Sequence, residues 1–163
     1  MRALLTLLWF TAVTALASGP PDFSAYPAPL RTVKDSPALR IPRSIHWKLA
    51  QDLRQNAKAP PNFAGKYTLV ECHSGTGYQE LALIDRVTGK IHTGLDCTLN
   101  APPDYKGRLG FHYRRDSSLV KVYKADKFAW PLTVESWHWD GSRFRLVHTE
   151  VLRRPEKSAT DKD

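Results

Sequence analysis

The sequence of 163 residues has two cysteines and one methionine, and it lacks the motifs of several large classes of protein. It has no His-x-x-x-His pair and no standard zinc spacing, so we expect no metal and no cofactor. It has no Gly-x-Ser-x-Gly turn and no carboxylate pair that stands out, so we expect no catalytic residues and no enzyme activity. It has no nucleic-acid recognition motif, which excludes nucleic acid as an expected partner.

The chain begins in the manner of an exported protein. Residues 1–17 join the basic Arg2 to an almost unbroken apolar run that ends on small residues at Ala15 and Ala17. This pattern is typical of a cleaved signal peptide, and the run is too short to span a bilayer. No cysteine stands at the cleavage site, so no stable membrane anchor is expected. We therefore predict a periplasmic or secreted protein after cleavage near Ala17.

The remaining chain is long enough for one domain. Residues 18–41 are rich in proline and lack periodicity, which predicts an extended leader. Residues 42–152 are expected to form a single β-rich domain with an N-terminal helix, and residues 153–163 a charged tail. The net charge of +8 comes mainly from scattered basic residues before Asn62, which we interpret as a solvated surface. The alternative is a basic arm that attracts an anionic surface such as phospholipid. The sequence does not indicate an oligomeric state.

The predicted fold class is mainly β with one amphipathic helix. Ile45, Leu49 and Leu53 recur at helical spacing between Pro42 and Pro60. After them the chain alternates short apolar stretches with turn residues, and the expected strands are 65–71, 79–85, 90–93, 111–115, 119–124, 132–139 and 143–152. Because no helix separates these strands, they predict an antiparallel sheet closed as a sandwich, a barrel or a short propeller-like domain.

The two cysteines are expected to be bridged. In an oxidising compartment Cys72 and Cys97 most simply form one disulfide, which would add about 3 kcal/mol of stability in the chain-entropy model. A metal pair and a cysteine nucleophile beside His73 are the alternatives. Neighbours on an extended chain point to opposite faces, so Cys72 and His73 are poorly placed to act on each other.

The tryptophans allow a second kind of site. Trp137 and Trp139 share one face of a predicted strand, among other aromatic residues. Such rings usually belong to the core and to cross-strand pairs, but an exposed pair can stack on sugars. The alternative function is therefore a non-catalytic glycan- or lipid-binding module of the cell envelope.

The loop that follows Cys72 is polar and contains two glycines. It reads Ser74-Gly75-Thr76-Gly77-Tyr78, and the glycines permit a backbone with positive φ. The strand ends and a disulfide at Cys72 would hold the loop rigid, and a rigid loop loses little entropy on docking. Tyr78 offers a large flat ring with one hydroxyl. The loop is therefore suited to filling a polar cleft of another protein.

The pattern Ser-Gly-x-x-Tyr in this loop resembles the inhibitory-loop motif of bacterial periplasmic lysozyme inhibitors and of immunity proteins against lysozyme-like effectors. The stretches 62–67, 75–77, 84–85 and 88–90 are also similar to a set of small, uncharacterised secreted bacterial proteins. In that set the glycine loop often ends in a cysteine, where this chain has Tyr78, so any disulfide has to use Cys97.

The resemblance to the inhibitors implies a small exported β-structure and a specific mode of action. The expected partner is a lysozyme-like glycan hydrolase or a secreted effector that cleaves peptidoglycan. By the same resemblance, Ser74 engages the catalytic carboxylate of that enzyme and Tyr78 fills a sugar subsite, with Gly75, Thr76 and Gly77 shaping the loop.

Overall fold

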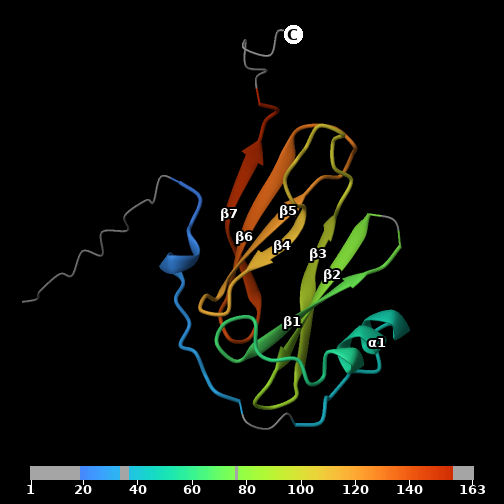
Figure 1. Ribbon diagram of the computed structural model, residues 1–163, viewed down its shortest axis with the longest axis vertical. Coiled ribbons are helices and arrows are strands. Elements are labelled where there is room, and N and C mark those ends of the chain that lie inside the picture. The colour runs from blue at the N-terminus through green and yellow to red at the C-terminus, as the bar shows by residue number, and fades with distance from the viewer. Residues whose placement is uncertain (1–18, 34–36, 76, 156–163) are drawn as a thin grey trace, which may run out of the picture.

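The structure is a computed structural model that describes residues 19–33, 37–75 and 77–155 (Figure 1). Two helical elements are described, the 3-10 helix η1 (Phe23–Ala25) and the α-helix α1 (Trp47–Gln55). The strands of the described chain are β1 (Tyr67–His73), β2 (Tyr78–Asp85), β3 (Ile91–Thr98), β4 (Gly110–Tyr113), β5 (Leu119–Lys124), β6 (Leu132–Trp139) and β7 (Phe144–Leu152). The predicted signal peptide at 1–17 lies outside the described residues, as does most of the predicted tail. Neither described helix has the length and apolar character that crossing a bilayer requires.

The strands form two antiparallel sheets with the orders β1-β2-β3 and β4-β5-β6-β7. The prediction of a mainly β, antiparallel fold is therefore confirmed. Neither sheet closes on itself within the described ranges, so the barrel alternative is wrong for that part of the chain. The predicted turn at Asp140 and Gly141 joins β6 to β7, where Trp139 pairs with Phe144.

Strand β3 continues well past its predicted end at residue 93. The next residue in the sequence is Gly94, a residue type that often ends a strand. In the structure Leu81 pairs with Leu95 while Ala82 pairs with Thr93, so Gly94 is an extra residue in the ladder with φ 134°. A bulge of this kind interrupts the register without ending the strand.

The facing surfaces of the two sheets enclose the main hydrophobic core. The three-stranded sheet contributes Leu69, Leu81, Leu83, Leu95 and Cys97, and the four-stranded sheet contributes Phe111, Val120, Val122 and Trp139. Phe63, which precedes β1, is fully buried between the sheets, and its ring contacts those of Tyr113 and Phe144. This ring therefore connects β1 to both edges of the other sheet.

The helix α1 covers the second face of the three-stranded sheet (Figure 1). Leu49 and Leu53 pack there in a separate cluster with Val70, Cys72, Ala82, Ile84 and Ile91. The helix begins at Trp47 and not at Pro42, because His46 is its N-cap and accepts a hydrogen bond at Nδ1 from Leu49 N–H at 3.3 Å. The three-stranded sheet is thus covered on both faces, as the apolar stretch in β2 predicts.

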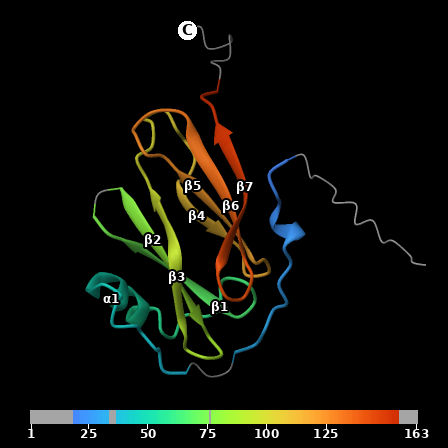
Figure 2. The same cartoon turned by 180° about the vertical axis from the view of Figure 1, so that it is seen from behind.

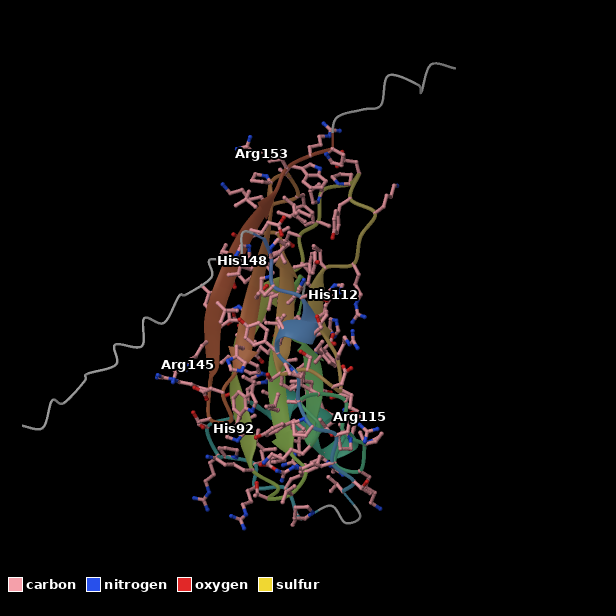
Figure 3. The ribbon with its side chains drawn as sticks, turned by 90° about the vertical axis from the view of Figure 1, so that its left-hand side faces the viewer. His92, His112, Arg115, Arg145, His148 and Arg153 are labelled. Carbon is pink, nitrogen blue, oxygen red and sulfur yellow. The ribbon has the colours of Figure 1, made fainter. Side chains whose placement is uncertain are left out.

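The predicted leader is held against the domain in its described part. Residues 19–33, here called the strap, contact the turn between β4 and β5. Ala28 N–H donates to Asp116 O at 2.8 Å, and Ser118 N–H donates to Tyr26 O at 2.9 Å. Figure 3 shows the strap crossing in front of the strands, and Figure 1 and Figure 2 place it on the opposite side of the molecule from α1. These bonds make the strap part of the folded domain.

The predicted disulfide is wrong, because Cys72 and Cys97 are free thiols on opposite faces of the three-stranded sheet. Cys72 pairs with Glu80 and packs towards α1, whereas Cys97 pairs with Gln79 and packs in the core between the sheets. Strand β2 also separates the two strands that carry them, which sets their Cα atoms about 10 Å apart. A disulfide requires roughly 4.4–6.8 Å between Cα atoms.

We expect both thiols to be reduced and protected in the folded protein. Burial is the main cause that raises the pKa of Cys72 and of Cys97 to about 12, so neither is a thiolate at neutral pH. Iodoacetamide should label neither residue in native protein and both residues in protein unfolded without reductant, as read by intact mass. Two residues that stay unlabelled after unfolding would show that the thiols are bridged.

Candidate functional site

The loop predicted as the binding site connects β1 to β2 at the free end of their hairpin (Figure 1). Its base is closed by a hydrogen bond from Ser74 N–H to Tyr78 O at 3.1 Å. A second bond, from Leu99 N–H to Gly77 O at 2.7 Å, ties the loop to the chain that follows β3. Gly75 and Gly77 have φ of 81° and 73°, which confirms the prediction of positive φ, while Thr76 lies outside the described residues.

Gly77 also lies close to the end of the Asn100 side chain. A Cβ at this position would lie 2.4 Å from Asn100 Oδ1, well inside a normal contact. The loop is therefore fixed at its C-terminal side by backbone geometry and by a close neighbour. These restraints replace the disulfide that the sequence predicted as its brace.

Tyr78 is half-buried and opens β2, so it stands at the base of the loop rather than at its tip. Its hydroxyl donates a hydrogen bond to the Asp96 carboxylate on β3 at 2.7 Å. This hydrogen bond, more than burial, raises the pKa of Tyr78 to about 12, so the phenol stays neutral and remains a donor. Of the remaining described loop residues, Gly75 is exposed and Ser74 is half-buried.

Carboxylates gather around the base of the loop. Glu80 and Asp96 pair across β2 and β3 on the same face as Tyr78. Thr98, which pairs with Tyr78, donates its hydroxyl to Asp126 at 2.6 Å. These carboxylates outnumber the ammonium of Lys48, which donates to the carbonyl of His73 at the same hairpin end. This end of the sheet is therefore acidic in a chain whose net charge is +8.

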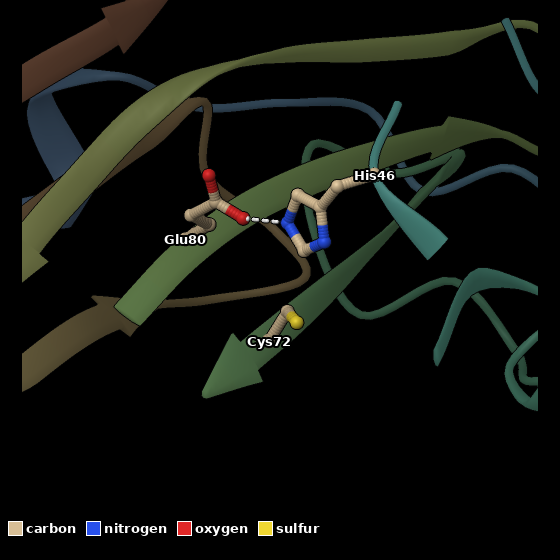
Figure 4. A group of neighbouring side chains, drawn as sticks. All are labelled: His46, Cys72 and Glu80. Atoms are coloured by element: carbon tan, nitrogen blue, oxygen red, sulfur yellow. Dashed lines mark hydrogen bonds and ion pairs between the residues drawn. The ribbon is translucent and has the colours of Figure 1, made fainter. Parts of the chain in front are cut away.

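A group of three potential metal ligands lies beside the acidic end of the sheet (Figure 4). His46, Cys72 and Glu80 each offer one ligand atom, and these atoms lie within 4.8 Å of one another. His46 Nε2 lies 2.5 Å from Glu80 Oε2. Burial is the main cause that raises the pKa of the Cys72 thiol, and the carboxylate of Asp52 on α1 raises it further. The fully buried, neutral thiol argues against a cysteine nucleophile here.

The sequence pattern does not reveal this cluster. Its members come from the start of α1 and from two strands, so their spacing along the chain matches no standard motif. One signal was available, because a hairpin around residues 74–77 places Cys72 opposite Glu80. The position of His46 depends on how α1 packs on the sheet, which the sequence pattern does not give.

The other face of the hairpin end carries a separate polar group, and His73 is part of it. Gln79 is buried there and donates its amide to Glu71 Oε2 at 2.7 Å, and it lies 3.2 Å from His73 Nε2. Tyr113 donates its hydroxyl to Glu71 Oε1 at 3.1 Å, which joins the two sheets. His73 and Cys72 thus point to opposite faces, which agrees with the alternation expected of neighbours on a strand.

The tryptophans of the alternative glycan site face the interior. Trp137 and Trp139 lie on the same face of β6, as predicted. Trp139 is 4% exposed and packs in the core, while Trp137 is partly buried against it and donates its indole N–H to Glu135 Oε2 at 3.0 Å. Trp139 therefore presents no open ring face on which a sugar could stack.

Comparisons with known proteins do not assign the chain to a family. No family model matches the chain, no curated protein matches it, and no solved structure matches it. The functional argument therefore depends on the residues and on their arrangement in the fold.

Proposed function

We propose that this chain is an exported inhibitor or immunity protein that blocks a peptidoglycan-cleaving, lysozyme-like enzyme with the loop at 74–78. Export follows from the signal-peptide pattern at 1–17. The proposal treats the two facing sheets as a β-sandwich that presents the loop at one end. The observation that carries it is the Ser-Gly-x-x-Tyr loop, whose described residues are partly or fully exposed and which is tied at its base to the segment that follows β3.

The restraints on the loop favour binding because they limit the entropy that is lost on docking. Ser74 and Gly77 are both held by backbone hydrogen bonds, and Tyr78 is held by Asp96. A side chain that already occupies one position gives up little rotamer freedom when a partner encloses it. In the complex, the Tyr78 hydroxyl has to keep its hydrogen bond to Asp96 or donate instead to an acceptor on the target enzyme.

The local charge favours a cationic target. Asp96 and Asp126 are exposed near the loop, and Glu80 is partly exposed beside them. Complementary charge speeds association and suppresses wrong partners, although it adds less to affinity than buried contacts do. A basic glycan hydrolase would therefore be drawn to this end of the molecule in spite of the chain's overall positive charge.

We expect Tyr78→Ala to weaken inhibition of the target hydrolase by at least about 30-fold, as a centrally placed tyrosine hot spot contributes roughly 2 kcal/mol or more. The measurement is the inhibition constant for the clearing of a peptidoglycan suspension, over a panel of lysozyme-like enzymes. Tyr26→Ala is the matched control, because Tyr26 is also half-buried but belongs to the strap. Tyr78→Phe separates the contribution of the ring from that of the hydroxyl, which donates a hydrogen bond to Asp96.

Equal inhibition by the wild type and by Tyr78→Ala would remove the loop as the inhibitory element. A protein that inhibits no enzyme of the panel but sediments with purified peptidoglycan would favour the alternative of a glycan-binding module. Loss of that sedimentation in Trp137→Ala would then place the glycan at the partly buried tryptophan.

A further inference from the structure

We propose that His46, Cys72 and Glu80 form a binding site for a zinc ion between the start of α1 and the three-stranded sheet. Each residue comes from a different element, and their ligand atoms converge within 4.8 Å (Figure 4). Zinc bonds of about 2.0–2.3 Å in tetrahedral geometry separate neighbouring ligand atoms by roughly 3.3–3.8 Å. The cluster therefore needs only small side-chain rotations to surround an ion. This inference does not depend on the proposed inhibitory function.

The fold brings two of the ligands together by strand pairing. Cys72 of β1 lies directly opposite Glu80 of β2, so their side chains are neighbours on the face that α1 covers. His46 is the N-cap of α1, which places its ring over the same face. The positions of all three residues are thus set by the backbone before any ion binds.

The types of ligand select the ion. A thiolate with an imidazole and a carboxylate is a zinc-type set, whereas magnesium and calcium prefer oxygen ligands alone. The thiolate and the carboxylate together carry two negative charges, which balance a divalent cation at a partly buried position. Asp52 supplies a further carboxylate beside the Cys72 sulfur.

Proton movements accompany binding. In the structure His46 Nδ1 accepts from Leu49 N–H, so Nε2 carries the proton that faces Glu80. When the ion binds, the Zn–S bond forms as the Cys72 proton leaves to solvent. The proton on His46 Nε2 moves through water to Nδ1, which frees the Nε2 lone pair to bind the ion. Nδ1 then no longer accepts from Leu49 N–H, so the 3.3 Å N-cap hydrogen bond is lost. No oxidant or reductant takes part.

Bound zinc would connect α1 to the base of the hairpin that carries the 74–78 loop. Cys72 is two residues before Ser74, and Glu80 is two residues after Tyr78, so the two ligands enclose the loop symmetrically. The ion would therefore brace the hairpin on the face towards α1, close to the position of the disulfide that the sequence predicts.

The test is a titration of untagged, metal-free protein with zinc against a chromophoric chelator, followed by cobalt absorption spectroscopy. We expect one equivalent of zinc to bind and cobalt to give a thiolate charge-transfer band. Cys72→Ser should remove that band and weaken zinc binding by about 100-fold or more, and Glu80→Gln should weaken it by at least about 10-fold. Cys97→Ser is the matched control, since Cys97 is equally buried but faces the other side of the sheet.

Three results would overturn the site: no zinc binding by the wild type, a cobalt spectrum without the thiolate band, or equal losses in Cys72→Ser and Cys97→Ser. Circular dichroism identifies a variant that fails to fold. If Cys72→Ser fails to fold, zinc binding by Glu80→Gln tests the site instead. This variant should fold, because Glu80 is partly exposed and glutamine has the same shape. Undiminished binding by folded Glu80→Gln protein would contradict the proposal.

Discussion

Phe63→Ala should lower the free energy of unfolding by about 3–5 kcal/mol, the usual effect of removing a fully buried phenylalanine ring. Phe63 is 0% exposed, and its ring lies against Tyr113 at one edge of the four-stranded sheet and Phe144 at the other. Its removal leaves a cavity where the two sheets meet. Because a domain of this size is stable by only about 5–15 kcal/mol, this loss removes a large fraction of the total stability.

Urea denaturation of both proteins measures this effect, and Phe128→Ala is its control. Phe128 is 72% exposed, so its truncation should change the free energy of unfolding by less than about 0.5 kcal/mol. Similar losses in the two variants would mean that the sheets do not enclose Phe63 as the structure has it. The arrangement of the two sheets, and with it the position of the hairpin, would then need revision.

Gly65→Ala should be the second strongly destabilising change, with an expected loss of about 3 kcal/mol or more. Gly65 has φ 74°, where an alanine costs roughly 1–2 kcal/mol by itself. A Cβ there would also lie 1.9 Å from the carbonyl oxygen of Pro29 in the strap. The strap would have to move away, which breaks the hydrogen bond from Arg31 N–H to Gly65 O at 3.2 Å.

Gly141→Ala separates backbone strain from the contact with the strap. Gly141 has φ 96°, but a Cβ added there would meet no atom within 4 Å, so its substitution should cost only the strain, about 1–2 kcal/mol. Thermal unfolding compares the variants, and amide exchange at Ala28 should accelerate in Gly65→Ala alone. Equal stability of the two variants would show that the strap does not rest on Gly65.

The sequence was most informative where local chemistry decides the structure. The Asp140-Gly141 turn between two alternating stretches predicted the β6–β7 hairpin, and the uninterrupted apolar stretch in β2 predicted a strand covered on both faces. Gly75 and Gly77 adopt the positive φ values that their residue type allows. These features depend on residues that are close together along the chain.

The sequence was least informative where distant segments meet. The separation into two sheets, the packing of α1 and the attachment of the strap all depend on tertiary contacts that no local pattern encodes. The disulfide prediction failed for this reason, because compartment and cysteine count do not show which face of a sheet each thiol occupies. The cluster of His46, Cys72 and Glu80 was missed for the same reason, although the register of the hairpin pairs two of its members.

The most direct test of the central claim is competition between this protein and a peptidoglycan oligosaccharide for the active-site cleft of an enzyme that it inhibits. Isothermal titration of the enzyme with the protein, at increasing oligosaccharide concentrations, measures this competition. Since one cleft cannot hold both the loop at 74–78 and the sugar, we predict that the apparent affinity falls in proportion to the oligosaccharide concentration. An affinity that is independent of the oligosaccharide would contradict the account, because both would then be bound at once.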